Sequence, residues 1–319
     1  MKQKAIIVAV LGHQNRSKTG RPTAPAKRWF WREHWIQKAG SVLILNELPA
    51  PLDEPAGRHG CAIPPGDAMA MAHHDFRMPR LYVEHPLERD ARITLDRQQA
   101  HYLVNVLRLA TGATVLAFNG RDGEWRSGLA VEGRKRLALT VREQTRPQPP
   151  PADLDYLFAP LKHARLDYMV QKAVEMGATR LMAVLSRHTQ PQRVNLERMR
   201  ANAIEAAEQC GILAIPTIEA PVAFDRVLAE WPSQRLLVFC DEGAAAGDPL
   251  AVLTAARAAG RAALAVLIGP EGGFADEERT ALLRLPNVVR LSLGPRILRA
   301  DTAAVAALAL VQATLGDWL

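Results

Sequence analysis

Two glycine-rich segments near the C-terminus carry the residue types from which a ligand pocket could be built. The first is Ile268-Gly269-Pro270-Glu271-Gly272-Gly273-Phe274, and the second is Leu293-Gly294-Pro295-Arg296-Ile297-Leu298-Arg299-Ala300-Asp301-Thr302-Ala303. Each follows a short apolar run and precedes a helix-like run, which predicts a turn between a strand and a helix. Because ligands of open α/β sheets bind at the carboxyl ends of strands, the two turns are predicted to form two walls of one pocket.

The residues within the first turn narrow the chemistry of this ligand. Neither segment has the Gly-Lys-Ser/Thr of a phosphate-binding loop or the G-x-G-x-x-G of a dinucleotide site. The carboxylate of Glu271 would repel a phosphate, but it would favour ribose hydroxyls, an ammonium or a sulfonium. This preference points to an adenosyl ligand without phosphates, such as S-adenosylmethionine. Each turn alone is also compatible with a tight β–α connection that binds nothing.

Together the two segments resemble the signature of the RsmE family, SPOUT-class methyltransferases that modify N3 of a uridine in small-subunit ribosomal RNA. Residues 205–211 (EAAEQCG) resemble the family's helix-end motif, and residues 172–177 (KAVEMG) resemble its first catalytic-domain helix. The order and spacing of all four segments agree with the family, and the likeness covers about residues 78–319. The resemblance implies an α/β fold whose C-terminal SPOUT domain contains a deep trefoil knot, with a small PUA-like β-barrel before it.

The resemblance also assigns the cofactor site. It implies that S-adenosylmethionine is held by the knotted loops and the end of a neighbouring strand. The residues expected to bind it are Phe239, Cys240, Ile268, Gly269, Pro270, Glu271, Gly272, Leu293, Gly294, Ile297 and Leu298.

Methyl transfer to a uridine N3 needs groups that deal with a proton and a developing negative charge, because N3 must lose its proton to attack. Arg296 and Arg299 are the candidates to stabilise the uracil oxyanion or to bind an RNA phosphate. Asp301 is a candidate proton acceptor, and Asp301 or Thr302 is equally suited to cap the helix that follows. Surface ion pairs are the alternative role for the two arginines.

Three residues are expected to contact the RNA: His101 and Arg108 in the barrel, and Lys172 in the catalytic domain. The partners implied are 16S ribosomal RNA or the small ribosomal subunit and a second copy of the chain, in the cytoplasm and with no membrane. No arrangement of His, Cys, Asp and Glu predicts a metal site.

The sequence departs from the family pattern at three positions. Asp301 stands where the family usually has Glu, which keeps the charge and shortens the reach. Ile212 replaces a common Arg, which removes one expected RNA or subunit contact. Ala275 replaces Ser or Thr, so we expect helix capping to shift to Asp276.

Composition fits this organisation. Three widely spaced cysteines form neither a disulfide framework nor a metal pattern, which is typical of a reducing compartment. The net charge of +7 is uneven: residues 78–146 hold 12 Lys or Arg and 8 Asp or Glu, whereas residues 147–319 hold 17 and 19. A basic small domain beside a near-neutral one favours RNA docking by the former, although a solvated basic surface has the same signature.

The chain divides into four expected regions. Residues 1–77 are interpreted as an N-terminal extension that is disordered or non-native, with Met78 as the biological start. Residues 78–146 are predicted to be the barrel, with one helix at about 97–107. Residues 147–152 form a proline-rich linker. Residues 153–319, in which strands and helices alternate, are predicted to be the SPOUT domain.

Two alternatives remain open at this point. A SPOUT methyltransferase that acts on another RNA, such as tRNA, would carry the same motifs. A noncatalytic RNA-binding protein of ribosome assembly would need only the barrel, and intact glycine motifs argue against it.

Overall fold

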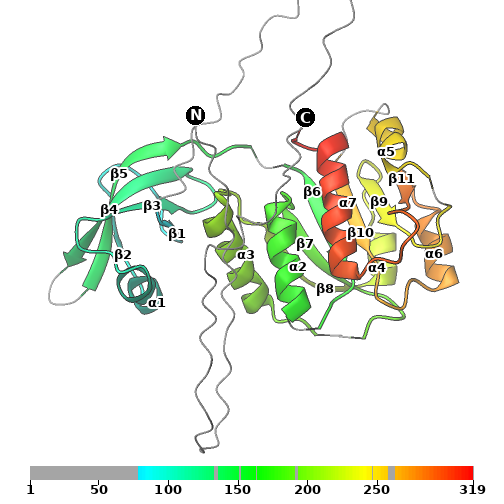
Figure 1. Cartoon of the computed structure of the whole chain (residues 1–319), viewed down its shortest axis with the longest axis horizontal. Helices are drawn as coiled ribbons and strands as arrows, with labels where there is room; N and C mark the ends of the chain where they lie inside the picture. Colours follow the sequence, from blue (N-terminus) through cyan, green and yellow to red (C-terminus); the bar gives the residue numbers. More distant parts are fainter. Residues whose placement is uncertain are drawn as a thin grey trace, which may run out of the picture. The chain divides into compact units, whose positions relative to one another are not determined.

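The structure is a computed structural model that describes residues 78–132, 136–150, 152–162, 164–190, 193–245, 247–257 and 263–318 (Figure 1). The expected N-terminal extension, residues 1–77, lies outside the described residues.

The first part of the described chain is a small, mostly antiparallel β-sheet. Its strands are β1 (Arg80–Tyr82), β2 (Arg92–Thr94), β3 (Thr114–Phe118), β4 (Glu124–Glu132) and β5 (Arg136–Arg146). They lie in the order β1-β3-β4-β5-β2, and only the β1–β3 pair is parallel. Leu103, Val115, Leu139 and Val141 are fully buried in the core of this sheet.

The helix expected at 97–107 has two parts. An α-helix, α1 (Arg97–His101), is followed by a π-helical turn, η2 (Tyr102–Val106). Asp96 starts α1 because its carboxylate accepts a hydrogen bond from the Gln99 amide, while the Gln99 side chain accepts one from the Asp96 amide. The helix expected at about 97–107 is therefore present, with a π-helical second half.

The second part is a parallel six-stranded sheet covered by helices. Its strands are β6 (Leu154–Phe158), β7 (Arg180–Leu185), β8 (Thr217–Ala223), β9 (Leu236–Cys240), β10 (Leu264–Ile268) and β11 (Val288–Leu291). Its helices are α2 (Ala164–Glu175), α3 (Leu196–Cys210), α4 (Phe224–Ala229), α5 (Pro249–Arg257), α6 (Asp276–Leu282) and α7 (Ala300–Thr314). The strand order is β11-β9-β10-β6-β7-β8. The predicted α/β class is thus confirmed.

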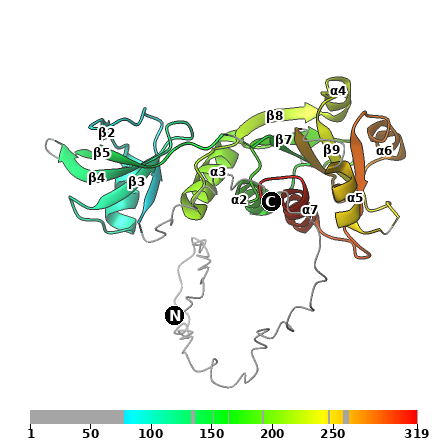
Figure 2. The ribbon, with the colours of Figure 1, turned by 90° about the horizontal axis from the view of Figure 1, so that it is seen from above.

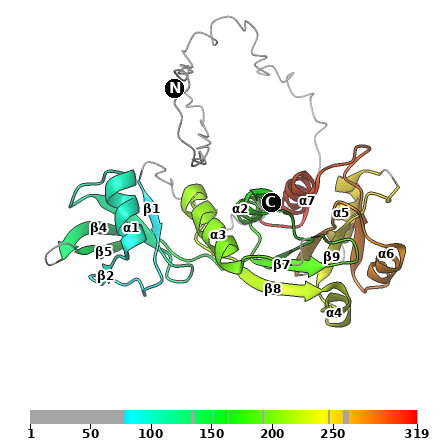
Figure 3. The same ribbon diagram turned by 90° about the horizontal axis from the view of Figure 1, so that it is seen from below.

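Helices cover both faces of this sheet. Helices α2, α3, α5 and α7 lie on one face, and α4 and α6 lie on the other (Figures 2 and 3). Alternate residues of β6 point to the two faces of the sheet. Tyr156 packs with the hydrophobic cluster under α2, α3 and α7, and Leu157 packs with the cluster under α4 and α6. Burial on both faces explains why β6 and β10 are buried throughout.

The apolar spacing of α2 predicts its buried stripe. Leu166, Met169, Val170, Ala173 and Val174 follow the i, i+3, i+4, i+7, i+8 pattern, and all five are buried. This face packs on the sheet and against α3 and α7.

A buried ion cluster joins the small sheet to the end of α3. The carboxylate of Glu124 accepts hydrogen bonds from Arg80 Nε at 2.8 Å and Arg146 Nη2 at 2.7 Å. The same arginines donate to carbonyls after α3, with Arg80 Nη2 3.0 Å from the oxygen of Ile212 and Arg146 Nη2 2.9 Å from that of Gly211. Burial would raise the pKa of Glu124, but the hydrogen bonds and charges of Arg146 and Arg80 outweigh burial and lower it. Ile212 therefore contributes to this junction through its backbone carbonyl.

Strand order brings the two glycine-rich segments together. β9 lies between β10 and β11 in the sheet, and all three strands are parallel. The segment after β10 and the segment after β11 therefore flank the end of β9 at one edge of the sheet. This is the arrangement that the sequence predicted.

Candidate functional site

A cavity of about 310 Å³ opens at the carboxyl ends of β9, β10 and β11. Two loops form most of its wall: loop one, residues 269–275, and loop two, residues 292–299. The lining residues are Cys240, Asp241, Glu242, Ile268, Gly269, Pro270, Glu271, Gly273, Phe274, Arg279, Leu291, Ser292, Leu293, Gly294, Pro295, Arg296, Ile297, Leu298, Arg299, Ala300 and Ala303. The volume is at the lower end of the range for small-molecule sites.

Most residues expected to bind the cofactor line this cavity, but two do not. Phe239 is fully buried in the hydrophobic cluster under α4 and α6. Gly272 faces outward, since a Cβ built on it would lie 3.3 Å from Cβ of His188. A side chain at position 272 would therefore meet His188 before it filled the cavity.

Loop one is held by aromatic packing. A Cβ on Gly269 would lie 2.6 Å from Cε2 of Phe274, so only glycine lets the ring lie against the loop backbone. The Phe274 ring in turn packs on Phe224, with centroids 5.7 Å apart, and on Phe239 at 5.4 Å. The loop is thus anchored to the hydrophobic cluster on the α4 and α6 face.

Hydrogen bonds add to this anchor. The Gly273 amide donates to the Pro270 carbonyl at 2.9 Å, which closes the turn. Nδ1 of His188, from the loop after β7, lies 3.1 Å from the Gly273 carbonyl. His188 carried no recognisable signal in the sequence, because its contact depends on the order of β7 and β10 in the sheet.

The helix after loop one begins without the expected Asp276 cap. α6 starts at Asp276 with Ala275 as N-cap, and the carboxylate of Glu278 accepts a hydrogen bond from the Ala275 amide at 3.0 Å. One orphan amide is therefore satisfied from within the first turn.

Loop two is much more open. Ile297 is 91% exposed, and Gly294, Pro295, Arg296 and Arg299 are exposed as well. Among the described residues, none accepts a hydrogen bond from the backbone amides of residues 293–298, of which Pro295 has none to donate. The loop therefore offers unpaired donors beside the cavity.

The expected catalytic residues divide between two environments. Arg296 and Arg299 line the cavity, and within the described part of the chain neither forms an ion pair. Asp301 lies in the first turn of α7 and outside the cavity lining, where its carboxylate accepts a hydrogen bond from the Thr302 amide at 2.9 Å. The expected capping role was wrong: α7 begins at Ala300, and its N-cap, Arg299, makes no side-chain hydrogen bond.

The carboxylate of Glu271 faces a cation within the protein. Arg165 Nη1, from the start of α2, lies 3.9 Å from Glu271 Oε1, and both side chains are about half exposed. The pair is solvated, so it orients the rim of loop one more than it stabilises the fold.

Cys240 forms part of the cavity floor, with a thiol of low reactivity at neutral pH. Burial, with a smaller contribution from the nearby Asp241 carboxylate, raises the pKa of its thiol to about 12. A thiol with this pKa stays protonated at neutral pH, so Cys240 is a poor nucleophile there.

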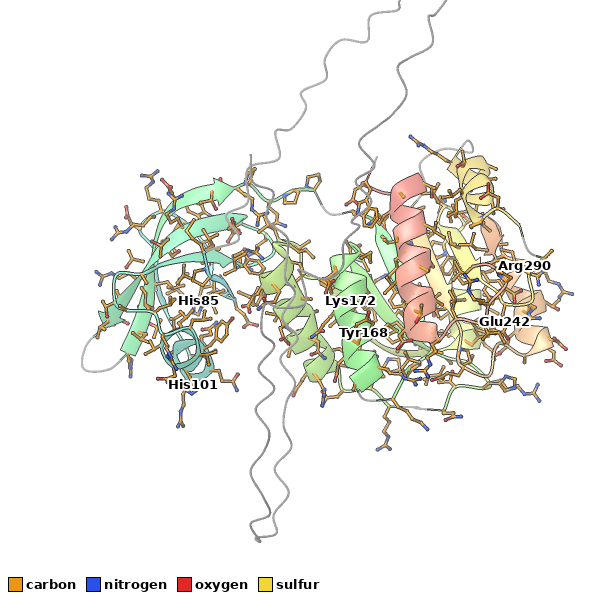
Figure 4. The ribbon with its side chains drawn as sticks, viewed as in Figure 1. His85, His101, Tyr168, Lys172, Glu242 and Arg290 are labelled. Carbon is orange, nitrogen blue, oxygen red and sulfur yellow. The ribbon has the colours of Figure 1, made fainter. Side chains whose placement is uncertain are left out.

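The structure places the expected RNA contacts on two different parts of the chain. His101 is exposed at the junction of α1 and η2, and Arg108 is exposed just after η2, with a positive φ of 57°. Lys172 lies on α2, where its amine contacts the Glu175 carboxylate at 2.7 Å and lies 5.6 Å from the Tyr168 ring centroid. Figure 4 labels His101, Tyr168 and Lys172. None of the three expected RNA contacts lines the cavity.

Several lining residues were missing from the predicted site. Asp241 and Glu242 follow β9 at the strand end that the resemblance places close to the cofactor, although neither was named among the residues expected to bind it. Arg279 comes from α6 and had no signal, because its position depends on the packing of α6 next to the end of β9.

These features fit an adenosyl ligand. The wall combines apolar side chains with backbone that the glycines leave uncovered, and a Cβ on Gly294, with φ 99°, would meet nothing within 4 Å. Unpaired amides in loop two can donate to a purine or a ribose. Within the described residues, no group of three His, Cys, Asp or Glu side chains could hold a metal ion.

Comparisons with known proteins agree with this site. The RNA methyltransferase domain family matches residues 148–312, and the RNA methyltransferase PUA domain family matches residues 95–142. The ribosomal RNA small subunit methyltransferase E of Rickettsia conorii is 30% identical over 234 residues, which cover 73% of this chain and 94% of that protein. The enzyme of the same name from Synechocystis is 32% identical over 231 residues, covering 71% and 74%.

A solved structure gives the same result. The ribosomal RNA small subunit methyltransferase E of Neisseria gonorrhoeae, bound to S-adenosylmethionine, matches with a TM-score of 0.66 and 25% identity, over 76% of this chain and all of that one. The fold and the site thus define an RNA methyltransferase with a PUA domain. More particularly, the chain belongs to the ribosomal RNA small subunit methyltransferase E family.

The family and fold class predicted from the sequence are therefore confirmed, while the trefoil knot stays a prediction. In the described part of the chain, every helix is too short or too polar to cross a membrane.

Proposed function

We propose that this protein transfers a methyl group from S-adenosylmethionine to N3 of a uridine in 16S ribosomal RNA. The observation that carries the proposal is the cavity between loops one and two, with two exposed arginines at its wall. Its glycine backbone, unpaired amides and lack of a phosphate-binding motif suit an adenosyl group.

The bound cofactor would supply a methyl group on a sulfonium, ready for in-line displacement. Backbone of Gly269–Pro270 and Leu293–Leu298 would form the two walls around it, and Cys240 with Ile268 would form the floor. Burial raises the pKa of the Cys240 thiol, which disfavours a covalent intermediate on this residue, so direct transfer from the sulfonium is the proposed route.

Arg296 and Arg299 would bind the target nucleotide. Deprotonation at N3 spreads negative charge onto the uracil carbonyl oxygens, and a guanidinium at the cavity wall stabilises that charge as it develops. In the other role consistent with their exposure, one arginine holds the RNA phosphate and so orients the base. Asp301 or a water molecule next to it would accept the proton.

The small β-sheet domain would dock the ribosomal RNA. It carries the basic surplus of the described chain, with 12 basic and 8 acidic residues over residues 78–146. His101 and Arg108 are exposed there, and Lys172 would add a contact from α2. Affinity that rests on such phosphate contacts falls as salt rises.

The proposed assembly is a homodimer that acts on the small ribosomal subunit in the cytoplasm. Helix α7 has partly exposed apolar residues beside its buried ones, and Ile297 and Trp318 are exposed near its ends. The dimer would be refuted if light scattering shows a monomer and the same preparation methylates its RNA substrate.

A methylation assay tests the function directly. Small ribosomal subunits from cells lacking the protein, incubated with it and labelled S-adenosylmethionine, should gain one methyl group on one uridine. Mass spectrometry of the digested RNA should identify 3-methyluridine. Label that appears in tRNA and not in 16S ribosomal RNA would move the assignment to a tRNA methyltransferase.

A further inference from the structure

The carboxylate of Asp241 is buried at the carboxyl end of β9, and both of its oxygens accept hydrogen bonds. Its side chain is 1% exposed. Oδ2 accepts from Arg290 Nε at 2.6 Å, and Oδ1 lies 3.2 Å from Arg279 Nη2 and accepts from the Gly243 amide at 2.9 Å. A buried charge persists in a fold when partners of this kind surround it.

The two arginines come from the elements that flank the two pocket loops. Arg279 lies in α6, which begins directly after loop one, and Arg290 lies in β11, which ends directly before loop two. The Asp241 amide adds a hydrogen bond to the Leu291 carbonyl at 3.0 Å. One residue at the end of β9 is thus tied to the elements that flank both loops. Figure 4 labels Arg290 and Glu242 in this part of the molecule.

The turn after Asp241 is shaped to receive these partners. A Cβ on Gly243 would lie 2.9 Å from Arg279 Nη1, so the guanidinium rests on bare backbone. Asp241, Glu242 and Arg279 all line the cavity. Asp241 with Arg279 and Arg290 forms a clamp, and a change in this clamp would therefore move the cavity wall itself.

From this geometry we propose that Asp241 is a positioning residue for the cofactor, which sets the separation of loop one and loop two. The inference rests on the proposed function, since it names S-adenosylmethionine as the ligand of the cavity. It gives Asp241, Arg279 and Arg290 one shared role, in which Asp241 acts on the loops through α6 and β11, the elements that flank them.

The same sheet offers a matched control at its opposite edge. Asp155, in β6, is 3% exposed and binds two arginines, Arg180 of β7 and Arg235, whose Nε lies 3.2 Å away. None of these three residues lines the cavity. Asp155→Asn therefore removes a similar buried charge from a similar pair of arginines without touching the pocket.

Isothermal titration with S-adenosylhomocysteine, beside thermal unfolding, separates the two roles. Both Asp241→Asn and Asp155→Asn should lower the unfolding midpoint. Only Asp241→Asn should weaken binding, by tenfold or more, and raise the KM for S-adenosylmethionine while kcat at saturation stays within threefold. Binding by folded Asp241→Asn within twofold of wild type, or an equal loss in Asp155→Asn, would overturn the proposal.

A milder variant covers the case in which Asp241→Asn does not fold. Arg279→Gln leaves the Arg290 pair intact and should still weaken binding at least threefold, whereas unchanged binding would contradict the clamp. Failure of the wild-type protein to bind S-adenosylhomocysteine would instead overturn the proposed function, and the clamp with it.

Discussion

Loop one and loop two follow two strands at the same edge of the sheet and enclose one cavity, yet they are held in opposite ways. Loop one places Phe274 in an aromatic cluster, and His188 contacts it from outside. Loop two carries an isoleucine that is 91% exposed, two arginines without ion pairs among the described residues, and amides without partners there. The two walls thus differ in how completely the protein itself determines their shape.

This difference suggests that loop one and loop two have different functions in the pocket. A wall fixed by core packing is pre-organised, so a ligand that binds it loses little free energy in ordering it. A wall with exposed side chains and free donors can be completed by whatever binds last. We therefore expect damage to loop one to act on the cofactor. Loss of the two arginine side chains of loop two, whose backbone forms the other wall around the cofactor, should act on the RNA and on the chemical step.

The largest effect is expected from Arg299→Ala in loop two. Loss of one donor to a developing oxyanion typically lowers turnover about 100-fold to 1,000-fold. The affinity for S-adenosylhomocysteine should stay within threefold, because the proposed partner of Arg299 is the RNA. Steady-state kinetics on undermodified subunits, with titration calorimetry, measure the two quantities.

Arg284→Ala is the control for this substitution, since Arg284 is exposed and lies outside the cavity lining. It should leave both quantities near wild type. A loss of cofactor affinity in Arg299→Ala as large as its loss of turnover would break the division between the loops.

Gly269→Ala tests the anchored wall and should act on the cofactor. The new Cβ would lie 2.6 Å from the Phe274 ring, which Phe224 and Phe239 hold in place. We expect a cost of about 2 kcal/mol in the free energy of unfolding from overpacking. Cofactor affinity should fall roughly 30-fold if the loop shifts by the same free energy.

Gly128→Ala, in β4, is the control because a Cβ there meets nothing within 4 Å. Urea unfolding and titration calorimetry should show little change for it. Gly269→Ala with wild-type affinity would mean that loop one is not a cofactor wall.

The sequence predicted the two loops that line the pocket, but not the contacts that fix these loops in place. Glycine and proline after apolar runs mark strand-to-helix turns through local backbone physics, so loops one and two were predictable from their own residues. The contacts that fix them are between residues far apart in the chain: His188 meets Gly273, and Asp241 meets Arg279. Such pairs depend on strand order and helix packing, which no local pattern contains.

The same limit explains why two residues that were expected to bind the cofactor do not line the cavity. Phe239 and Cys240 are neighbours on β9, and successive side chains of a strand point to opposite faces, so only one of them could reach the cavity. Gly272 belongs to the right loop, but the turn directs its missing side chain toward His188. A motif identifies the loop, whereas the direction of each residue needs the fold.

Alkylation of Cys240 at the cavity floor measures how open loop two leaves the cavity, and a bound ligand should slow this reaction about tenfold. With a pKa of about 12, its alkylation rate by iodoacetamide should rise about 100-fold from pH 7 to pH 9 without levelling, because the thiolate fraction grows tenfold per unit. The raised pKa means that reactivity is low at neutral pH and appears only as pH rises. Saturating S-adenosylhomocysteine should slow the reaction about tenfold by covering the floor.

The measurement uses a variant with Cys61→Ser and Cys210→Ser, so that only Cys240 reacts. Mass spectrometry gives the extent of alkylation over time. An alkylation rate that is unaffected by the ligand would place the ligand away from the floor.

The smallest effect is expected from His188→Ala. The imidazole supports loop one from outside through its contact with the Gly273 carbonyl, but Phe274 and the Gly273–Pro270 hydrogen bond remain in the variant. Loss of one exposed hydrogen bond costs about 0.5–1 kcal/mol, which corresponds to roughly threefold in cofactor affinity. Arg187→Ala, which removes a solvated pair with Glu277 next door, should change affinity less than this. If His188→Ala instead lowers turnover with no change in cofactor affinity, then His188 faces the substrate, and loop one is less self-contained than its packing suggests.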